Sequence, residues 1–421
     1  MILFAPNPTG SGHNMRALSI AQAVRRRNDE ADIVVALASL QQTFTPLFEA
    51  SGVRVVDIAG RLVDYSKSSN LGKTLDWNSY IGGYIANTFM SGERVLSYIA
   101  LISELSPSVL VSDFNMAACM AAIFCDVPLV FITERYDFTL CQLGDDELTA
   151  GEFIVNAEEM KRARTALHKQ FDWMIQNCGL VLTDKPYIES LDQGTPVEAA
   201  LTSGLGKFVG PMIRDVVAQS TGTPRDDLGI GSAPYIVASI SGTTMFSDSK
   251  ERVLNAYVEA FQTLRAEMPD LKLVLLGRKD IEAGDGIISV PYYPAWMSLL
   301  KEAELLLSAP GWITVTEISA LCVPTVFILP SNSEYHEIEA LKRLRELGFA
   351  THLGYDAFDL TTIMRQELTK DRKDPAYYLP HSRVASPDWK GADRAATLIL
   401  DLDQPQLPAR ATATAEVAHH A

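Results

Sequence analysis

A histidine within a glycine-rich segment is the residue of this sequence best placed for acid–base chemistry. The segment reads Pro8-Thr9-Gly10-Ser11-Gly12-His13-Asn14-Met15-Arg16, and it directly follows the apolar run Ile2–Ala5. Glycines let the backbone turn sharply and leave amide groups free at a helix start, which suits an anion. The positive end of the helix dipole favours the neutral imidazole, which is the form that a general base needs. We predict His13 as that base; the alternative is a histidine that merely caps a strand-to-helix turn.

Asp113 is the acidic residue that we expect beside His13. It follows the apolar strand Val109–Ser112, and the carboxyl ends of parallel strands meet at one edge of a sheet. A carboxylate there can bond the second imidazole nitrogen, which fixes the tautomer and stabilises the cation that forms on proton abstraction. The alternative role for Asp113 is the N-cap of a helix over Met116–Phe124, and the two roles are compatible.

Two further strand-to-helix turns lie in the second half of the chain. Ser241-Gly242-Thr243-Thr244 offers a nest of backbone amides that fits phosphate, although such a segment is also a common simple turn. The segment Pro310–Glu317 opens a helix with a glycine and a hydroxyl. It places Glu317 one turn inside, where a carboxylate can grip a ribose diol. The alternative for Glu317 is an ordinary acid of the first helical turn, favoured by the dipole.

Two polar pairs are weaker candidates. His336-Glu337 opens a helix after a polar loop and suits sugar hydroxyls, or else forms a solvated face with charges at helical spacing. Glu134-Arg135 follows the apolar strand Leu129–Ile132, and we interpret it as lining the acceptor side of a site. A surface ion pair explains Glu134 and Arg135 equally well.

Several motifs that would indicate other chemistry are missing. The sequence has no His-Glu-x-x-His, no Gly-x-x-x-x-Gly-Lys-Ser/Thr and no Gly-x-Ser-x-Gly. The dinucleotide fingerprint Gly-x-Gly-x-x-Gly is incomplete, because Met15 stands where the third glycine belongs. The one Asp-x-Asp motif, Asp401–Asp403, lies beside the C-terminal tail. We therefore predict neither a metal ion nor a cofactor, so that protein amides must hold a diphosphate.

Short apolar runs alternate with helical stretches in two successive blocks. This pattern predicts an α/β fold of two Rossmann-like, doubly wound parallel-sheet domains that face a central cleft. The domains span 1–213 and 233–385, joined by a Gly-, Pro- and Ser-rich linker over 214–232. A helix over 386–403 can pack back on the N-terminal domain, and 404–421 is predicted to be a disordered tail.

The expected strands are Ile2–Ala5, Ile33–Leu37, Val53–Ile58, Val109–Ser112, Leu129–Ile132, Leu180–Thr183, Tyr235–Ile240, Leu271–Leu276, Ile287–Val290, Leu305–Ser308 and Thr325–Leu329. The expected helices include Asn14–Arg27, Glu93–Leu105, Ala157–Asn177, Lys250–Glu267, Ala295–Ala303, Thr314–Leu321, Glu334–Leu347 and Gly391–Leu402.

Composition narrows the partners and the compartment. The 421 residues carry a formal net charge of -16, which repels nucleic acid and anionic membrane surfaces. Met1 runs straight into a predicted strand, and no apolar run is long enough to span a bilayer, so we expect neither a signal peptide nor a membrane segment. The five cysteines are scattered, which fits reduced thiols in a cytoplasmic protein.

The segment Leu305–Gly348 resembles the donor-binding region of GT-B glycosyltransferases. The family pattern is a strand, Gly-Gly-x-x-Thr-x-x-Glu, small-x-Pro-x-x-x-x-Pro and a polar helix. Here it reads Pro310-Gly311…Thr314…Glu317, Val323-Pro324…Pro330, then His336-Glu337. The branch that it resembles contains the bacterial peptidoglycan N-acetylglucosaminyltransferase and related antibiotic and lipid glycosyltransferases. Pro310 replaces the first glycine and removes one amide donor, and His336-Glu337 stands where relatives often carry Gln or Asp-Gln.

The resemblance implies an inverting transfer from a UDP- or dTDP-sugar to a hydroxyl or amine of an acceptor, and the acidic composition favours a soluble, natural-product-like acceptor. The C-terminal domain would hold the nucleotide and the N-terminal domain the acceptor, with His13 as base and Asp113 orienting it. The implied donor-binding residues are Ser241, Gly242, Thr243, Gly311, Trp312, Thr314, Glu317, His336 and Glu337. The implied acceptor-binding residues are Gly12, Asn14, Glu134, Arg135, Trp77 and Tyr80.

Two other functions stay open on the sequence. The loop around His13 also resembles nucleotide-sugar hydrolases of nonulosonic-acid biosynthesis, in which the same histidine would activate water. The long insertion Asp64–Ser91, which contains Trp77 and Tyr80, favours a transferase because aromatic rings suit a sugar or a flat aglycone, although such rings also pack in cores. The third possibility is a non-catalytic sugar-nucleotide-binding protein. The sequence determines neither the sugar, the nucleotide and the acceptor nor whether the protein is a monomer or a dimer.

Overall fold

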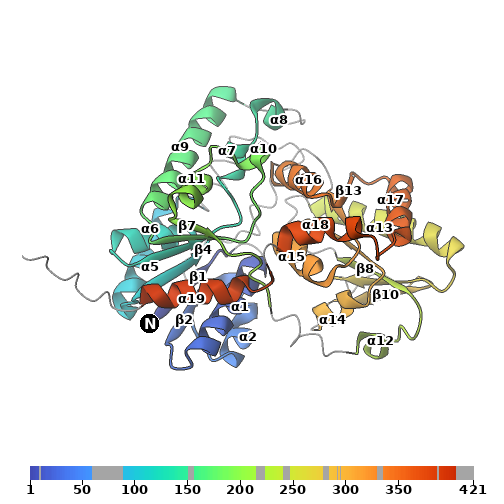
Figure 1. Cartoon of the computed structure of the whole chain (residues 1–421), viewed down its shortest axis with the longest axis horizontal. Coiled ribbons are helices and arrows are strands. Elements are labelled where there is room, and N and C mark those ends of the chain that lie inside the picture. Colours follow the sequence, from blue (N-terminus) through green and yellow to red (C-terminus); the bar gives the residue numbers. More distant parts are fainter. Residues whose placement is uncertain are drawn as a thin grey trace, which may run out of the picture.

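The computed structural model describes residues 1–8, 11–58, 89–149, 156–214, 223–239, 247–277, 284–291, 293, 295–329, 335–385 and 388–403. At 39–40, 148–149, 247–250 and 335–337 the description covers the backbone alone. Figure 1 shows two α/β domains side by side, with the last helix lying across the N-terminal one. The predicted fold class of two doubly wound parallel-sheet domains is confirmed.

The N-terminal sheet comprises seven parallel strands within the described residues, in the order β3-β2-β1-β4-β5-β6-β7. They are β1 (Ile2–Pro6), β2 (Ile33–Leu37), β3 (Arg54–Asp57), β4 (Val109–Asp113), β5 (Leu129–Ile132), β6 (Leu180–Thr183) and β7 (Gly206–Phe208). The strand order reverses between β1 and β4, which is where doubly wound sheets bind ligands. Pro6 is in register with Asp113, so the loops that follow these two strands begin next to each other.

The C-terminal sheet has six parallel strands among the described residues, in the order β10-β9-β8-β11-β12-β13. They are β8 (Tyr235–Ser239), β9 (Lys272–Leu276), β10 (Ile287–Val290), β11 (Leu305–Ser308), β12 (Thr325–Leu329) and β13 (Ala350–Leu353). Here the reversal falls between β8 and β11. The segment after β11 therefore lies at the corresponding switch point of this second sheet.

Helices cover both faces of each sheet. In the N-terminal domain they are α1 (Ser11–Arg27), the 3-10 helix η1 (Ser39–Phe44), α2 (Thr45–Ala50), α5 (Gly92–Leu105), α6 (Met116–Phe124), α7 (Thr139–Gln142), α8 (Asp145–Thr149), α9 (Ala157–Gln176), α10 (Glu189–Asp192) and α11 (Pro196–Ser203). The later helices are α12 (Pro224–Asp227), α13 (Ser247–Glu267), α14 (Trp296–Lys301), α15 (Trp312–Leu321), α16 (Tyr335–Leu347), α17 (Ala357–Thr369), α18 (Pro375–Ala385) and α19 (Gly391–Asp403).

The chain returns to the N-terminal domain at its last described helix. Ala395, Ala396 and Ile399 of α19 are buried in the same core as the residues of α1 and β1. The crossing is close: a Cβ added to Gly391 would lie 2.1 Å from the backbone oxygen of Gly210, so only glycine fits there. The helix α19 thus packs on the N-terminal domain, although it follows the C-terminal one in sequence.

Buried ion pairs join the two domains. Arg343 of α16 donates to both carboxylate oxygens of Asp192 in α10, at 3.0 and 2.6 Å. The Lys185 ammonium lies 3.3 Å from a carboxylate oxygen of Glu339, also on α16. All four side chains are at most 10% exposed, so these charges depend on one another for solvation.

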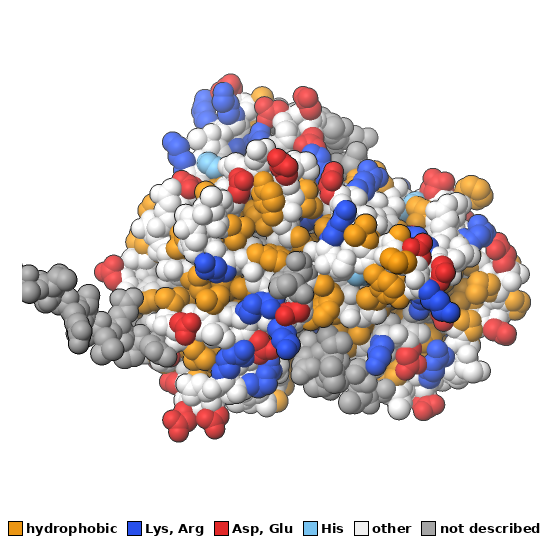
Figure 2. All heavy atoms as spheres, in the orientation of Figure 1, with side chains coloured by type: hydrophobic (Ala, Val, Ile, Leu, Met, Phe, Trp, Pro, Cys, Tyr) orange, Lys and Arg blue, Asp and Glu red, His pale blue; other side chains and the backbone are white. Residues whose placement is uncertain are grey.

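The surface carries charges of both signs, although the formal net charge is -16. Figure 2 shows acidic and basic side chains interspersed over the visible face, without one dominant basic area. In the part of the chain that the structure describes, no helix is long and apolar enough to cross a membrane.

His381 gives the C-terminal domain a pH-dependent stability that can be measured. Its ring packs edge-on against Phe349 at 5.4 Å, and burial together with Lys370 lowers its pKa to about 4. As the pH falls, His381 is protonated near pH 6.5 in the unfolded chain but only near pH 4 in the folded protein. We expect stability to be full above this window and to fall on the order of 2–3 kcal/mol across it. Urea unfolding at pH 7 and pH 4.5 should show a smaller fall for His381→Phe, and an identical fall would contradict this account.

Candidate functional site

His13 and Asp113 meet at the switch point of the N-terminal sheet. His13 lies in the first turn of α1, and Asp113 is the last residue of β4. The imidazole Nδ1 lies 2.8 Å from Asp113 Oδ1. Because an ionised carboxylate only accepts, this contact requires the proton on Nδ1 and leaves Nε2 unprotonated in the neutral ring. His13 is 8% exposed and Asp113 1% exposed. The structure thus brings together the two residues that were predicted as base and orienting acid.

The alternative role of Asp113 as a helix cap is wrong. The N-cap of α6 is Asn115, whose side chain accepts from the Ala118 amide at 3.2 Å. Phe114 separates the two and adopts a φ of 51°, which turns the chain between the strand and the cap. The Asp113 carboxylate is therefore free of capping and faces α1.

Arg16 connects this pair to Glu134, which was predicted on the acceptor side, and to Asp184, which the sequence did not reveal. It is 1% exposed and lies one turn after His13 on α1. Its Nε donates to Asp113 Oδ2 at 2.8 Å, and its Nη1 donates to Asp184 Oδ1 and Oδ2 at 3.1 and 3.0 Å. Its Nη2 donates to Glu134 Oε2 at 3.2 Å. We call Arg16, Asp113, Glu134 and Asp184 the Arg16 cluster.

The charges of the Arg16 cluster are strongly coupled. Burial lowers the pKa of Arg16, but the three carboxylates more than reverse this and hold it well above its ordinary value. Burial raises the pKa of Glu134, yet Arg16, His13 and other cations bring it well below its usual range. For Asp184 burial prevails, so its pKa is raised despite Arg16. Three carboxylates around one guanidinium leave an excess of negative charge beside His13.

The first turns of α1 and α15 meet across the domain boundary. A Cβ added to Gly12 would lie 3.4 Å from Cγ2 of Ile313, so the two helix starts are in van der Waals reach. Gly311 is the N-cap of α15 and is exposed, and Thr314 in the first turn is partly exposed. Both helices bring the positive ends of their dipoles to this junction, which suits an anionic group beside it.

Two predicted donor-binding residues, Trp312 and Glu317, have partners within the protein. Trp312 Nε1 donates to Asp184 Oδ1 at 3.1 Å, so this indole reaches into the N-terminal domain. Glu317 is 2% exposed and accepts from Arg214 Nη2 at 2.6 Å and from Trp296 Nε1 at 3.0 Å. The alternative reading of Glu317 as a first-turn acid is wrong, because α15 has none in its first turn.

The predicted acceptor-side residues divide into several groups. Asn14 is 1% exposed and accepts from Gln41 Nε2 at 2.8 Å, which links the first turn of α1 to η1. Glu134 joins the Arg16 cluster and not a surface pair with its neighbour. The Arg135 guanidinium lies 4.5 Å from the centre of the Phe114 ring. Trp77 and Tyr80, like the donor-side Ser241, Gly242 and Thr243, fall outside the described residues. His336 and Glu337 begin α16, where the backbone alone is described.

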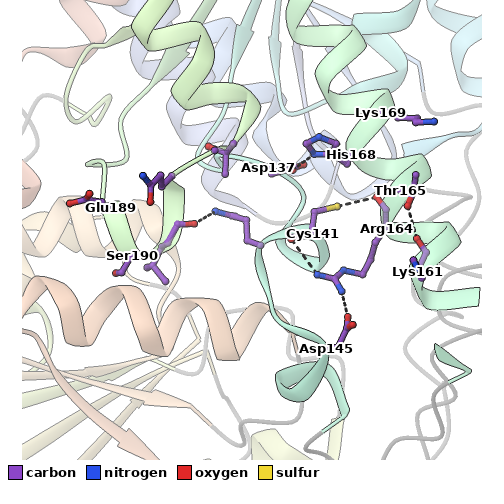
Figure 3. Close-up of a pocket in the computed structure, with 15 residues that line it drawn as sticks. Asp137, Cys141, Asp145, Lys161, Arg164, Thr165, His168, Lys169, Glu189 and Ser190 are labelled. Carbon is purple, nitrogen blue, oxygen red and sulfur yellow. Dashed lines mark hydrogen bonds and ion pairs between the residues drawn. The ribbon is translucent and has the colours of Figure 1, made fainter. Parts of the chain in front are cut away.

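A second histidine–aspartate pair lies elsewhere in the N-terminal domain and was not predicted. His168 Nδ1 of α9 lies 2.6 Å from Asp137 Oδ2, and Figure 3 shows the pair on the wall of a cavity between α7, α9 and α10. The cavity measures about 760 Å³, and Cys141 and Arg164 also line it. The signal in sequence was weak, because Asp137 and His168 are 31 residues apart and neither follows a glycine-rich turn. None of the contacts described for His168 involves α15.

In the described part of the chain, no group of three or more His, Cys, Asp or Glu side chains is arranged to hold a metal ion. The carboxylates of the Arg16 cluster are directed at a guanidinium, which occupies their acceptor oxygens.

Two doubly wound domains whose switch points face each other form a GT-B fold, as the sequence resemblance implied. CalG4, the calicheamicin glycosyltransferase, has this fold: it superimposes with a TM-score of 0.62 at 16% identity, over 95% of this chain and 98% of CalG4. Os79 from O. sativa in complex with UDP gives a TM-score of 0.64 at 15% identity, over 96% of this chain and 100% of Os79.

The fold is shared with another class of enzyme. A putative UDP-N-acetylglucosamine 2-epimerase from Listeria monocytogenes superimposes with a TM-score of 0.58 at 11% identity, over 95% of this chain and 94% of the epimerase. At such identities the likeness shows the fold alone.

A comparison of sequences also finds a glycosyltransferase. The UDP-N-acetylglucosamine--N-acetylmuramyl-(pentapeptide) pyrophosphoryl-undecaprenol N-acetylglucosamine transferase of Lacticaseibacillus casei (strain BL23) is 25% identical over 218 residues. These residues make up 50% of this chain and 52% of the relative, so the chain spans about half the length of the curated relatives that it matches. No family model matches the chain.

Proposed function

We propose that this protein is an inverting glycosyltransferase that moves a sugar from a UDP- or dTDP-sugar to a hydroxyl or amine of an acceptor. The observation that carries the proposal is the His13–Asp113 pair, 2.8 Å apart, beside the junction of two helix starts from different domains. A base and an anion-binding site are the two elements that such a transfer needs. The GT-B fold and the curated transferase relative support this class of reaction.

The arrangement suits a single displacement at the anomeric carbon. His13 Nε2 would take the proton of the acceptor O–H or N–H while that atom forms its bond to the sugar. The bond between the sugar and the diphosphate breaks, and the nucleoside diphosphate leaves with the electron pair. Asp113 stabilises the imidazolium that results, and the facing helix starts stabilise the negative charge on the leaving group. Attack from the side opposite the leaving group inverts the anomeric configuration.

Nucleotide binding in the C-terminal domain is supported by the fold neighbour that is complexed with UDP. We place the diphosphate at Gly311 and Thr314 and, following the resemblance, the ribose at Glu317. Because helix amides supply the positive potential, we propose that no metal is required, and full activity after treatment with EDTA would agree with this.

Glu317 provides a test of the donor site with two opposed outcomes. A carboxylate that grips a ribose should lose at least tenfold in nucleotide affinity on Glu317→Ala, about 1.4 kcal/mol. Calorimetric titration with UDP and dTDP measures this directly. The matched variant Arg214→Met removes the ion-pair partner of Glu317 but keeps the carboxylate. Unchanged affinity in Glu317→Ala would contradict the ribose placement and leave Glu317 as the partner of Arg214 and Trp296.

Hydrolysis, with water activated by His13, is the competing reaction. The fold alone does not separate hydrolysis from sugar transfer, because it also occurs in an enzyme of another class, an epimerase. We expect slow loss of sugar from UDP- and dTDP-sugars when no acceptor is present, and rapid turnover when the right acceptor is added. Chromatography of the released sugar distinguishes the cases. Fast hydrolysis without an acceptor would replace the transferase proposal, and tight nucleotide binding without turnover on any acceptor would indicate a binding protein.

A further inference from the structure

Arg16 holds the carboxylate that orients His13. Asp113 Oδ1 lies 2.8 Å from His13 Nδ1 and also accepts from Arg16 Nη2 at 3.2 Å. Arg16 Nε donates to the other oxygen, Oδ2, at 2.8 Å. A guanidinium that engages both oxygens of a carboxylate fixes its plane, because the N–H donors form a rigid fork. The direction in which Asp113 Oδ1 meets the imidazole is therefore set by Arg16.

Asp184 holds Arg16 in turn and reaches the other domain. It lies directly after β6, is 0% exposed, and accepts from Arg16 Nη1 with both oxygens. Its Oδ1 also accepts from Trp312 Nε1 at 3.1 Å, and Trp312 is the first residue of α15 in the C-terminal domain. The Lys185 ammonium lies 5.2 Å from the centre of the same indole ring, and Trp312 is 8% exposed.

These contacts form one continuous path. It runs from Trp312 through Asp184, Arg16 and Asp113 to His13. The buried Lys185–Glu339 pair between the domains also touches this path, because the Lys185 ammonium lies over the Trp312 ring. The indole N–H of Trp312 is the hydrogen bond through which α15 joins the arrangement around the base.

We propose that Arg16 and Asp184 are positioning residues for His13, and that the Trp312–Asp184 hydrogen bond makes the orientation of the base depend on how the C-terminal domain is seated. This proposal rests on the proposed function only for its kinetic consequence. The same α15 presents Gly311 and Thr314 to the proposed diphosphate site. Binding of a donor at α15 would then be coupled to the orientation of His13. Proton abstraction would be slow whenever the C-terminal domain is displaced from the N-terminal one.

The test uses variants that each remove one contact and keep the shape. Trp312→Phe deletes the indole N–H, and Asp184→Asn keeps the size of the side chain while weakening its bonds to Arg16. Tyr293→Phe is the matched control: it removes a side-chain donor to a carboxylate, the 2.7 Å bond to Asp227, within the C-terminal domain and away from the path. Thermal melting confirms that each variant is folded.

The first readout does not depend on any activity. In protein with 15N-labelled histidine, the ring signals of His13, assigned with His13→Gln, should shift in Trp312→Phe and Asp184→Asn but not in Tyr293→Phe. Unchanged His13 signals in both path variants would overturn the proposal whatever reaction the protein catalyses. Shifted signals in a protein that transfers no sugar would sustain the path and reject the proposed function instead.

The second readout separates positioning from binding. Losing one orienting hydrogen bond should lower kcat about tenfold in Trp312→Phe, while the dissociation constant of the nucleotide stays within about twofold. A purely structural role would lower thermal stability without this split. A change confined to nucleotide affinity would overturn the proposal, because it would mean that Trp312 acts on the donor and not on the base.

Discussion

His13→Ala should lower the turnover number by about 10²–10⁴ while nucleotide binding persists, because the variant removes the general base and leaves both helix starts intact. The Asp113 carboxylate keeps its two donors from Arg16 in the variant, so it is not left as an unpaired buried charge. A steady-state assay with a UDP- or dTDP-sugar and its acceptor measures the effect, and calorimetry with the nucleotide verifies that the donor site survives.

The chain offers an unusually close control for this experiment. His168 also has its Nδ1 against a carboxylate, Asp137, at 2.6 Å, but it lies on α9 beside a separate cavity. His168→Ala therefore removes the same chemical group from the same kind of pair. We expect it to leave kcat within about twofold, since a surface-accessible substitution away from the reacting atoms changes little. Equal losses in the two variants, or near-wild-type turnover in His13→Ala, would remove His13 from the mechanism.

The fold was largely predictable because buried parallel strands are almost continuously apolar. Leu129–Ile132, Leu180–Thr183 and Leu305–Ser308 were predicted with the bounds that the structure shows. Elements without that signal were missed. β7 is only three residues long, β13 contains Thr351 and His352, and α18 carries Pro380 inside a helix.

The site was predictable only where a local pattern carries it. A histidine after a glycine-rich turn and an aspartate at the end of a strand both leave such patterns, and the strand register brings them together. The contacts that join Arg16 to Asp184 and Asp184 to Trp312 leave none. The two pairs are 168 and 128 residues apart in sequence, and a buried arginine is recognised only when its carboxylates are seen around it. Asn14, the polar residue beside His13, is buried and accepts from Gln41 Nε2, a contact that no local pattern predicts.

The domain interface should depend heavily on Arg343. Arg343→Met should lower the free energy of unfolding by about 3–5 kcal/mol, because it strands two buried carboxylates, Asp192 and Glu339, that this guanidinium neutralises. Asp192 is 0% exposed and Glu339 8% exposed, so water cannot replace the lost donors. Since α16 belongs to one domain and α10 to the other, the loss should also uncouple the unfolding of the two domains, so that we expect two melting transitions in calorimetry for Arg343→Met and one for the unchanged protein.

Arg365→Met is the control for Arg343→Met, because it breaks an arginine–glutamate pair at the surface. Arg365 and Glu267 have side chains that are 44% and 51% exposed, and we expect a cost below about 1 kcal/mol.

The pH dependence of stability provides an independent check of the Arg343 prediction. Burial alone would raise the pKa of Glu339, but Lys185 and Arg343 lower it to about 2. Its stabilisation is therefore complete above the unfolded value of about 4.5 and is lost as the pH falls toward about 2. Removing Arg343 should shrink that acid-dependent part, and an undiminished acid dependence in Arg343→Met would mean that Lys185 alone holds the Glu339 charge.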